Sequence, residues 1–133
     1  MTAPLVNVVT LDVPAVGTAG NDATTVLGEA PFAGVITGVA YVPAAAITGA
    51  ATNNRAVSLV NKGQAGSGTA VPATLAFGNA VNAVAFDEKT ITLSATAADL
   101  VVAAGDVLAW TSVHVGTGIT DPGGVVRVTV SRS

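Results

Sequence analysis

The sequence predicts one all-β domain, an antiparallel β-sandwich with a jelly-roll-like arrangement. Short apolar, β-branched segments recur along the 133 residues, and Gly, Pro, Asn and Asp separate them. No segment has a convincing helical periodicity, and no repeat of fixed period is visible. Near the end, Val126, Val128 and Val130 alternate with Arg127 and Thr129, which is typical of a half-buried strand.

The first 22 residues differ from the rest and leave two structures open. An apolar, strand-prone segment is followed by Pro14 and the loop Gly17–Asp22. The segment is either the first strand of the sandwich or an extended arm that pairs with the sheet edge of a partner. Residues 23–133 form the sandwich domain itself. In the arm alternative, the residues that contact the partner are Leu5, Val6, Val8, Val9, Leu11 and Val13.

About eight short strands follow from the alternation and the turn signals in the rest of the chain. The stretch from Pro43 to Asn54 is expected to be a long loop, because Pro43, Gly49 and Asn53-Asn54 oppose the helical tendency of its alanines. Gly63–Gly68 is expected to be a flexible tip. The predicted strands after the first segment are 23–27, 34–42, 56–60, 71–77, 90–94, 100–103, 107–115 and 126–130.

The strand expected at 107–115 raises a question of register. Leu108 and Trp110 share one face, whereas Val113 and Val115 fall on the opposite face. Either a bulge near residues 111–112 resets the alternation, or a partner subunit covers the second face. In the second case, the side chains expected at the subunit contact are Trp110, Ser112 and His114.

Composition indicates an assembled protein and excludes some partners. Half of the residues are hydrophobic, but only 10% are charged, against about 25% in ordinary globular domains. The net charge of −3 and five scattered basic residues argue against nucleic acid. The uncharged stretch Ala30–Asn54 is not expected to span a membrane, because Pro43 interrupts it and leucine is absent.

The titratable residues show no pattern of catalysis, so we do not expect an enzyme. The chain has one histidine, His114, and no cysteine, and nothing marks the nearby Ser112 as a nucleophile. Asp99, Asp106 and Asp121 could meet at one end of a sandwich and bind calcium, but turn-forming roles are commoner for such residues. The sequence therefore predicts no catalytic residue, no cofactor and no metal site.

Five segments within residues 33–130 carry a resemblance to a known family: Gly34–Val39, Ala45–Arg55, Val57–Gly63, Ala103–Leu108 and Gly116–Gly124. With these segments the chain resembles the small β-sandwich capsid decoration proteins of tailed bacteriophages. The resemblance implies a virion protein that is made in the host cytoplasm. Such a protein would bind the major capsid protein on the outside of the head, with the N-terminal arm as a candidate contact, stabilise the shell, and often form a homotrimer. No catalytic residues come with this resemblance.

A second function from another class stays open. The chain could be a carbohydrate-binding or receptor-binding sandwich of a phage fibre or a cell surface. That function would need exposed aromatic side chains, for which Trp110 and Tyr41 are the candidates.

Overall fold

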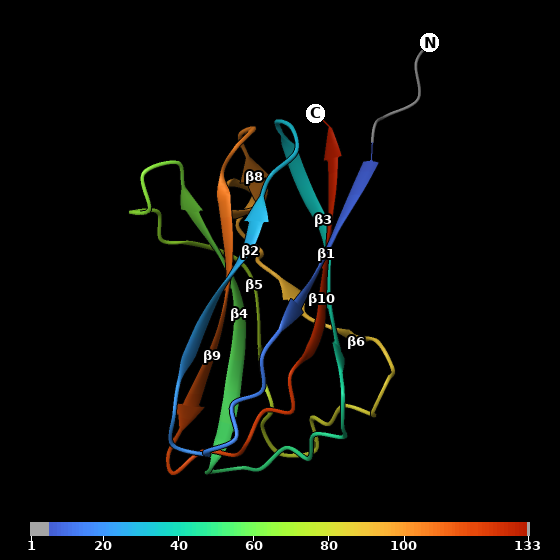
Figure 1. Ribbon diagram of the computed structural model, residues 1–133, viewed down its shortest axis with the longest axis vertical. Coiled ribbons are helices and arrows are strands. Elements are labelled where there is room, and N and C mark those ends of the chain that lie inside the picture. Colours follow the sequence, from blue (N-terminus) through green and yellow to red (C-terminus); the bar gives the residue numbers. More distant parts are fainter. Residues whose placement is uncertain (1–5, 133) are drawn as a thin grey trace.

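A computed structural model describes residues 6–132, which form two five-stranded antiparallel sheets packed face to face (Figure 1). The predicted β-sandwich is confirmed. One 3₁₀ turn, η1 (Ala97–Leu100), lies outside the sheets. The first sheet contains β1 (Val6–Val13), β10 (Gly124–Arg132), β3 (Gly34–Pro43), β6 (Lys89–Thr90) and β8 (Val101–Val102). The second contains β2 (Ala23–Glu29), β9 (Val107–Val115), β4 (Asn54–Gly63), β5 (Ala70–Ala76) and β7 (Thr92–Leu93).

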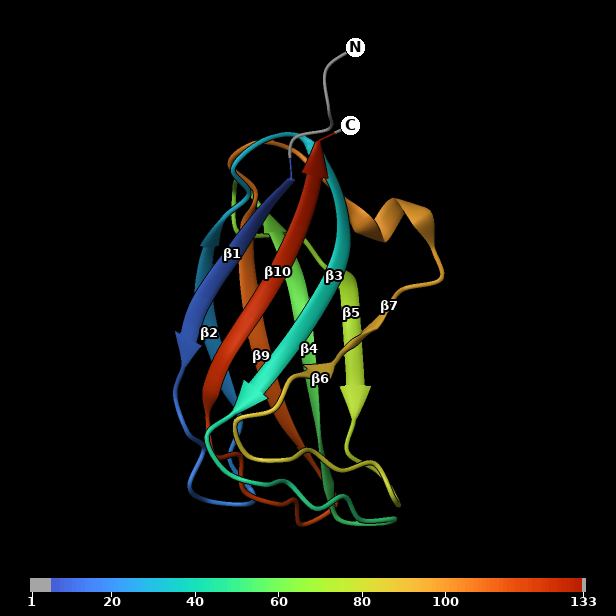
Figure 2. The same cartoon turned by 90° about the vertical axis from the view of Figure 1, so that its right-hand side faces the viewer.

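The strand order is that of a jelly roll. In the first sheet it is β1-β10-β3-β6, with β8 also paired to β3, and in the second it is β2-β9-β4-β5-β7. Most consecutive strands therefore cross from one sheet to the other, and β4 and β5 form the one long hairpin. Figure 2 shows β1, β10 and β3 in front of the second sheet. This is the pattern of two Greek keys in a double-sheet jelly roll.

The core consists of the inward residues of both sheets, as the alternation predicted. Val126, Val128 and Val130 of β10 lie against the inward side chains of β4 and β9. The largest aromatic side chains of the core, Trp110 and Tyr41, pack with their ring centres 5.6 Å apart and their planes tilted by 52°. Phe86 lies outside the core: it is 82% exposed, on a loop where its φ is +62°. With few aromatic residues, the core depends on valine, leucine and isoleucine packing.

Strand β9 corrects the expected subunit contact. Its pairing with β4 runs in unbroken register from Val115 to Leu108, so no bulge occurs near residues 111–112. Trp110 and Ser112 point into the protomer and are 2% and 4% exposed, so they cannot contact a second subunit across the sheet face. The exposed face of this strand carries Val113 and Val115 instead.

The N-terminal segment takes the strand alternative over the residues that the structure describes. β1 pairs with β10 along its whole length, from Val6 opposite Ser131 to Val13 opposite Gly124. Val13 is buried and Val9 is half-buried against the core, whereas Val6, Val8 and Leu11 are exposed. Leu5 lies outside the described residues. β1 is thus an edge strand of the sandwich.

Candidate functional site

Three arrangements of side chains could carry a function: a buried polar network, an uncharged sheet face and a hydroxyl-lined groove. The buried network joins β3, β4, β9 and the loop before β10. Asp121 is its centre: one carboxylate oxygen accepts bonds from the Tyr41 hydroxyl at 2.6 Å and the Gly123 N–H at 3.0 Å. The other oxygen accepts a bond from the Ser112 hydroxyl at 2.7 Å. All three side chains are at most 4% exposed.

Arg55 extends this network to the loops at the same end of the sandwich. Its Nη1 donates to the Ser112 hydroxyl at 3.2 Å. Its Nε and Nη2 donate to the carbonyl oxygens of Ile119, Ala19 and Asn21 at 2.8–3.1 Å. Because Arg55 is 1% exposed, these bonds replace the water that its charge would otherwise hold. The network therefore fixes the loops around residues 19–21 and 119–123.

The network has no access to a substrate, so its role is structural. Sequence reasoning missed it, although one signal was present. Arg55 has the same parity in β4 as the core residues Val57 and Leu59, so alternation alone placed a charged side chain on the inward face. A charge is buried only when it is paired or fully hydrogen-bonded.

His114 does not join Ser112 in a catalytic pair. Its ring Nδ1 lies 2.6 Å from the Asp22 carboxylate, whose same oxygen also accepts the His114 backbone N–H at 2.9 Å. These bonds, the backbone one first, hold the pKa of Asp22 below its ordinary value. Both side chains are partly exposed, at the end of the sandwich. The pair connects the loop before β2 to the end of β9.

The three turn aspartates are engaged separately. Asp99 accepts a bond from the Ser94 hydroxyl, and Asp121 belongs to the buried network. Asp106 accepts bonds from the Ala103 N–H and from the Asn61 side chain. Both bonds lower the pKa of Asp106, and the bond from Ala103 has the larger effect. Within residues 6–132, no three His, Asp or Glu side chains gather as metal ligands would. In the same range, no helix has the length and apolarity needed to cross a membrane.

The outer face of the second sheet is uncharged across three transverse rows of residues. The central row has one hydroxyl side chain on each strand, and Ser58 and Thr74 bond to one another at 2.7 Å. Rows of valine and alanine lie on either side, with Val26 70% exposed and Val113 41% exposed. We call these residues the neutral face. They are Thr24, Thr111, Ser58, Thr74 and Thr92 in the hydroxyl row; Val26, Ala109 and Val60 on one side; and Val113, Ala56 and Ala76 on the other.

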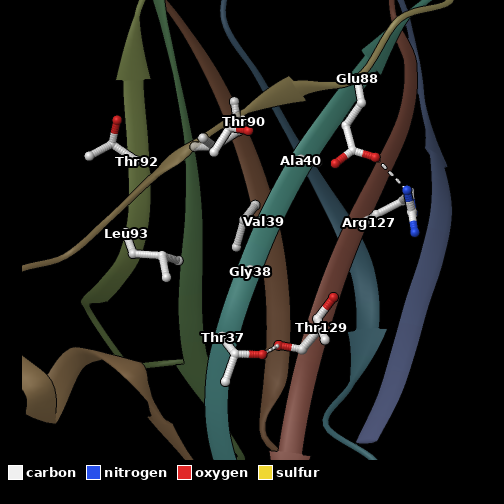
Figure 3. Close-up of a pocket in the computed structure, with 11 residues that line it drawn as sticks. Thr37, Gly38, Val39, Ala40, Glu88, Thr90, Thr92, Leu93, Arg127 and Thr129 are labelled. Atoms are coloured by element: carbon white, nitrogen blue, oxygen red, sulfur yellow. Dashed lines mark hydrogen bonds and ion pairs between the residues drawn. The ribbon is translucent and has the colours of Figure 1, made fainter.

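The outer face of the first sheet is different, because it is hollowed and carries charges. A groove of about 390 Å³ lies between β3, β10 and the segment that leads through β6 to β7 (Figure 3). Glu88 and Arg127 form an ion pair at one end of it, and Thr37 and Thr129 lie at the other. Sequence reasoning did not find this groove, because its lining comes from three distant segments.

Comparison of the chain with known protein families, with curated proteins and with solved structures found no match.

Proposed function

We propose that this chain is a structural virion protein, a jelly-roll subunit that binds the outside of a tailed-phage capsid and stabilises the shell. The observation that supports this most is the neutral face. A row of hydroxyls between rows of Val and Ala, without one charge, has little desolvation cost when another protein covers it. Jelly rolls occur in capsid proteins and in lectins alike, so the fold by itself does not choose between these functions.

We assign the neutral face to contacts between copies of this chain in a homotrimer. A face without charge offers nothing to a strongly charged partner, whereas hydroxyl side chains both donate and accept and so suit the different surface that a neighbouring copy presents in a threefold ring. The contact then uses Thr111, Val113 and Val115. They lie on the same strand as the sequence-predicted residues but on its opposite face.

We assign the outward residues of β1 to the major capsid protein. Val6 and Val8 are 53% and 41% exposed on an edge strand. An exposed apolar edge strand is a surface that another chain can pair with. Burial of apolar area contributes about 25 cal/mol per Å², and three copies in one trimer multiply a modest affinity for the shell.

Co-sedimentation with purified phage heads tests the function directly. The chain should pellet with heads and raise the temperature at which they release DNA. Val6→Asp with Val8→Asp should abolish pelleting while the protein stays folded, because both side chains are exposed. A folded chain that never pellets with heads, or a double variant that pellets undiminished, contradicts the proposal.

Sedimentation velocity tests the trimer. Val113→Lys places a charge on the neutral face and should convert trimers to monomers at micromolar concentration. Val101→Lys is the matched control, because Val101 is also an exposed strand valine but belongs to β8 in the other sheet. Two results would contradict the assigned contact. The first is wild-type protein that is monomeric in solution and on the heads, and the second is equal dissociation of both variants.

The alternative function loses the residues on which it depended. Tyr41 is fully buried and Trp110 is 2% exposed, so neither ring can stack on a sugar. A carbohydrate-binding role through Tyr41 or Trp110 is therefore not proposed.

A further inference from the structure

The groove on the first sheet has the features of a small-molecule site built without aromatic residues. Its volume of about 390 Å³ lies within the ~300–1,000 Å³ range of ligand pockets. Gly38 and Ala40 lie along its β3 side, where larger side chains would fill it. Space for a side chain exists at Gly38: a Cβ there would lie 3.8 Å from Thr129, which is an ordinary contact.

The lining is rich in hydroxyls and carries balanced charge. Four threonines surround the groove, and the one carboxylate, Glu88, pairs with the one guanidinium, Arg127. Both charged side chains are nearly half exposed, so their remaining donor and acceptor positions are open to a ligand. The threonines that line the groove are Thr37, Thr90, Thr92 and Thr129.

This chemistry selects among ligand classes. An anion such as phosphate would meet one cation that Glu88 already neutralises. A divalent cation would find a single carboxylate. An apolar ligand would leave the hydroxyls and the ion pair without partners. A neutral compound with many hydroxyls can instead donate to Glu88, accept from Arg127 and exchange bonds with the threonines.

We propose that this groove binds a neutral saccharide, with Glu88 and Arg127 holding adjacent hydroxyls and the threonines fixing its orientation. The site uses other residues than the proposed capsid contact but borders both assigned surfaces: Thr129 pairs with Val8 of β1, and Thr92 lies both in the groove and at the end of the hydroxyl row of the neutral face. A virion protein with such a site would hold the particle against glycans at a cell surface.

Ligand-observed NMR with glucose, galactose, mannose and N-acetylglucosamine, each as free sugar and as disaccharide, tests the site. At least one probe should bind with a Kd of about 1 mM or lower. Gly38→Val fills the groove and should weaken that binding at least about tenfold. Gly20→Val is the matched control: a Cβ at Gly20 meets nothing within 4 Å, and the residue lies in a loop far along the chain.

A second variant keeps the test decisive if the first one unfolds. Thr90→Val with Thr129→Val removes two hydroxyls without changing side-chain size or strand preference, and should also weaken binding about tenfold. The absence of binding to every probe overturns the proposal, and so does binding that survives both changes in folded protein. Gly38→Val should leave head co-sedimentation unchanged, because β10 lies between Gly38 and β1, so failure here is distinguishable from failure of the capsid role.

Discussion

The buried network around Asp121 and the groove beside Arg127 are both polar, and each contains one acidic and one basic side chain. In the network, every charged atom that donates or accepts is used within the protomer, because Arg55 and Asp121 are almost without exposure. In the groove, Glu88 and Arg127 bond to each other and keep half of their surface open. The difference lies in burial, and burial decides which cluster holds the fold together and which is free to bind.

The largest effect should come from the centre of the network. Asp121→Ala removes the acceptor of Tyr41, Ser112 and Gly123, and with it the carboxylate that Ser112 connects to the buried guanidinium of Arg55. Breaking a buried ionic cluster costs about 3–5 kcal/mol. Urea unfolding should show a loss of that size, with a smaller loss for Asp121→Asn. A loss below about 1 kcal/mol would contradict the assigned role.

Tyr41→Phe should have the next largest effect. It removes one buried hydroxyl and leaves an oxygen of Asp121 with one bond fewer, which costs about 1–3 kcal/mol. The same unfolding experiment measures it. Because the ring stays in contact with Trp110, near-ultraviolet circular dichroism should keep its aromatic signal. A more stable variant would show that the hydroxyl does not support the network.

Tyr41 should also lower the free energy of unfolding at alkaline pH. Burial first, and the bond to Asp121 second, raise the pKa of Tyr41 far above its ordinary value of 10.0. Unfolded protein therefore ionises at a lower pH than folded protein. Stability is present below pH 10 and falls as the pH rises further, by up to about 1.4 kcal/mol per pH unit. Tyr41→Phe should flatten this slope, and an unchanged slope would assign it to another group.

The exposed ion pair should matter least for folding. Glu88→Gln removes a surface pair whose contribution is below about 1 kcal/mol. Its melting temperature should stay close to that of the wild type, while saccharide binding weakens. A large loss of stability would mean that the Glu88–Arg127 pair stabilises the fold as the buried network does, and the contrast between the two clusters would not hold.

The sequence predicted the strands well and the polar clusters poorly, for one physical reason. Alternation is a local signal, so β9 and β10 could be read from neighbouring residues such as Val126 and Val128. The side-chain partners of Asp121 come from β3 and β9, Arg55 of β4 joins them through Ser112, and the partner of Arg127 comes from the segment before β6. Such contacts between distant segments depend on strand order and register, which local patterns do not specify. The error over Trp110 and Ser112 followed from assigning the inward face of β9 to a partner subunit.

The position of β10 also governs when this protein can fold. β10 lies between β1 and β3, and β9 lies between β2 and β4, so the last two strands of the described residues are central in their sheets. On the ribosome, β1 has no strand to pair with until β10 has been synthesised, on the order of ten seconds later. Pairings between such distant segments form slowly, and unpaired apolar strands aggregate meanwhile. Neither sheet can therefore be completed before its central strand, β9 or β10, has left the ribosome.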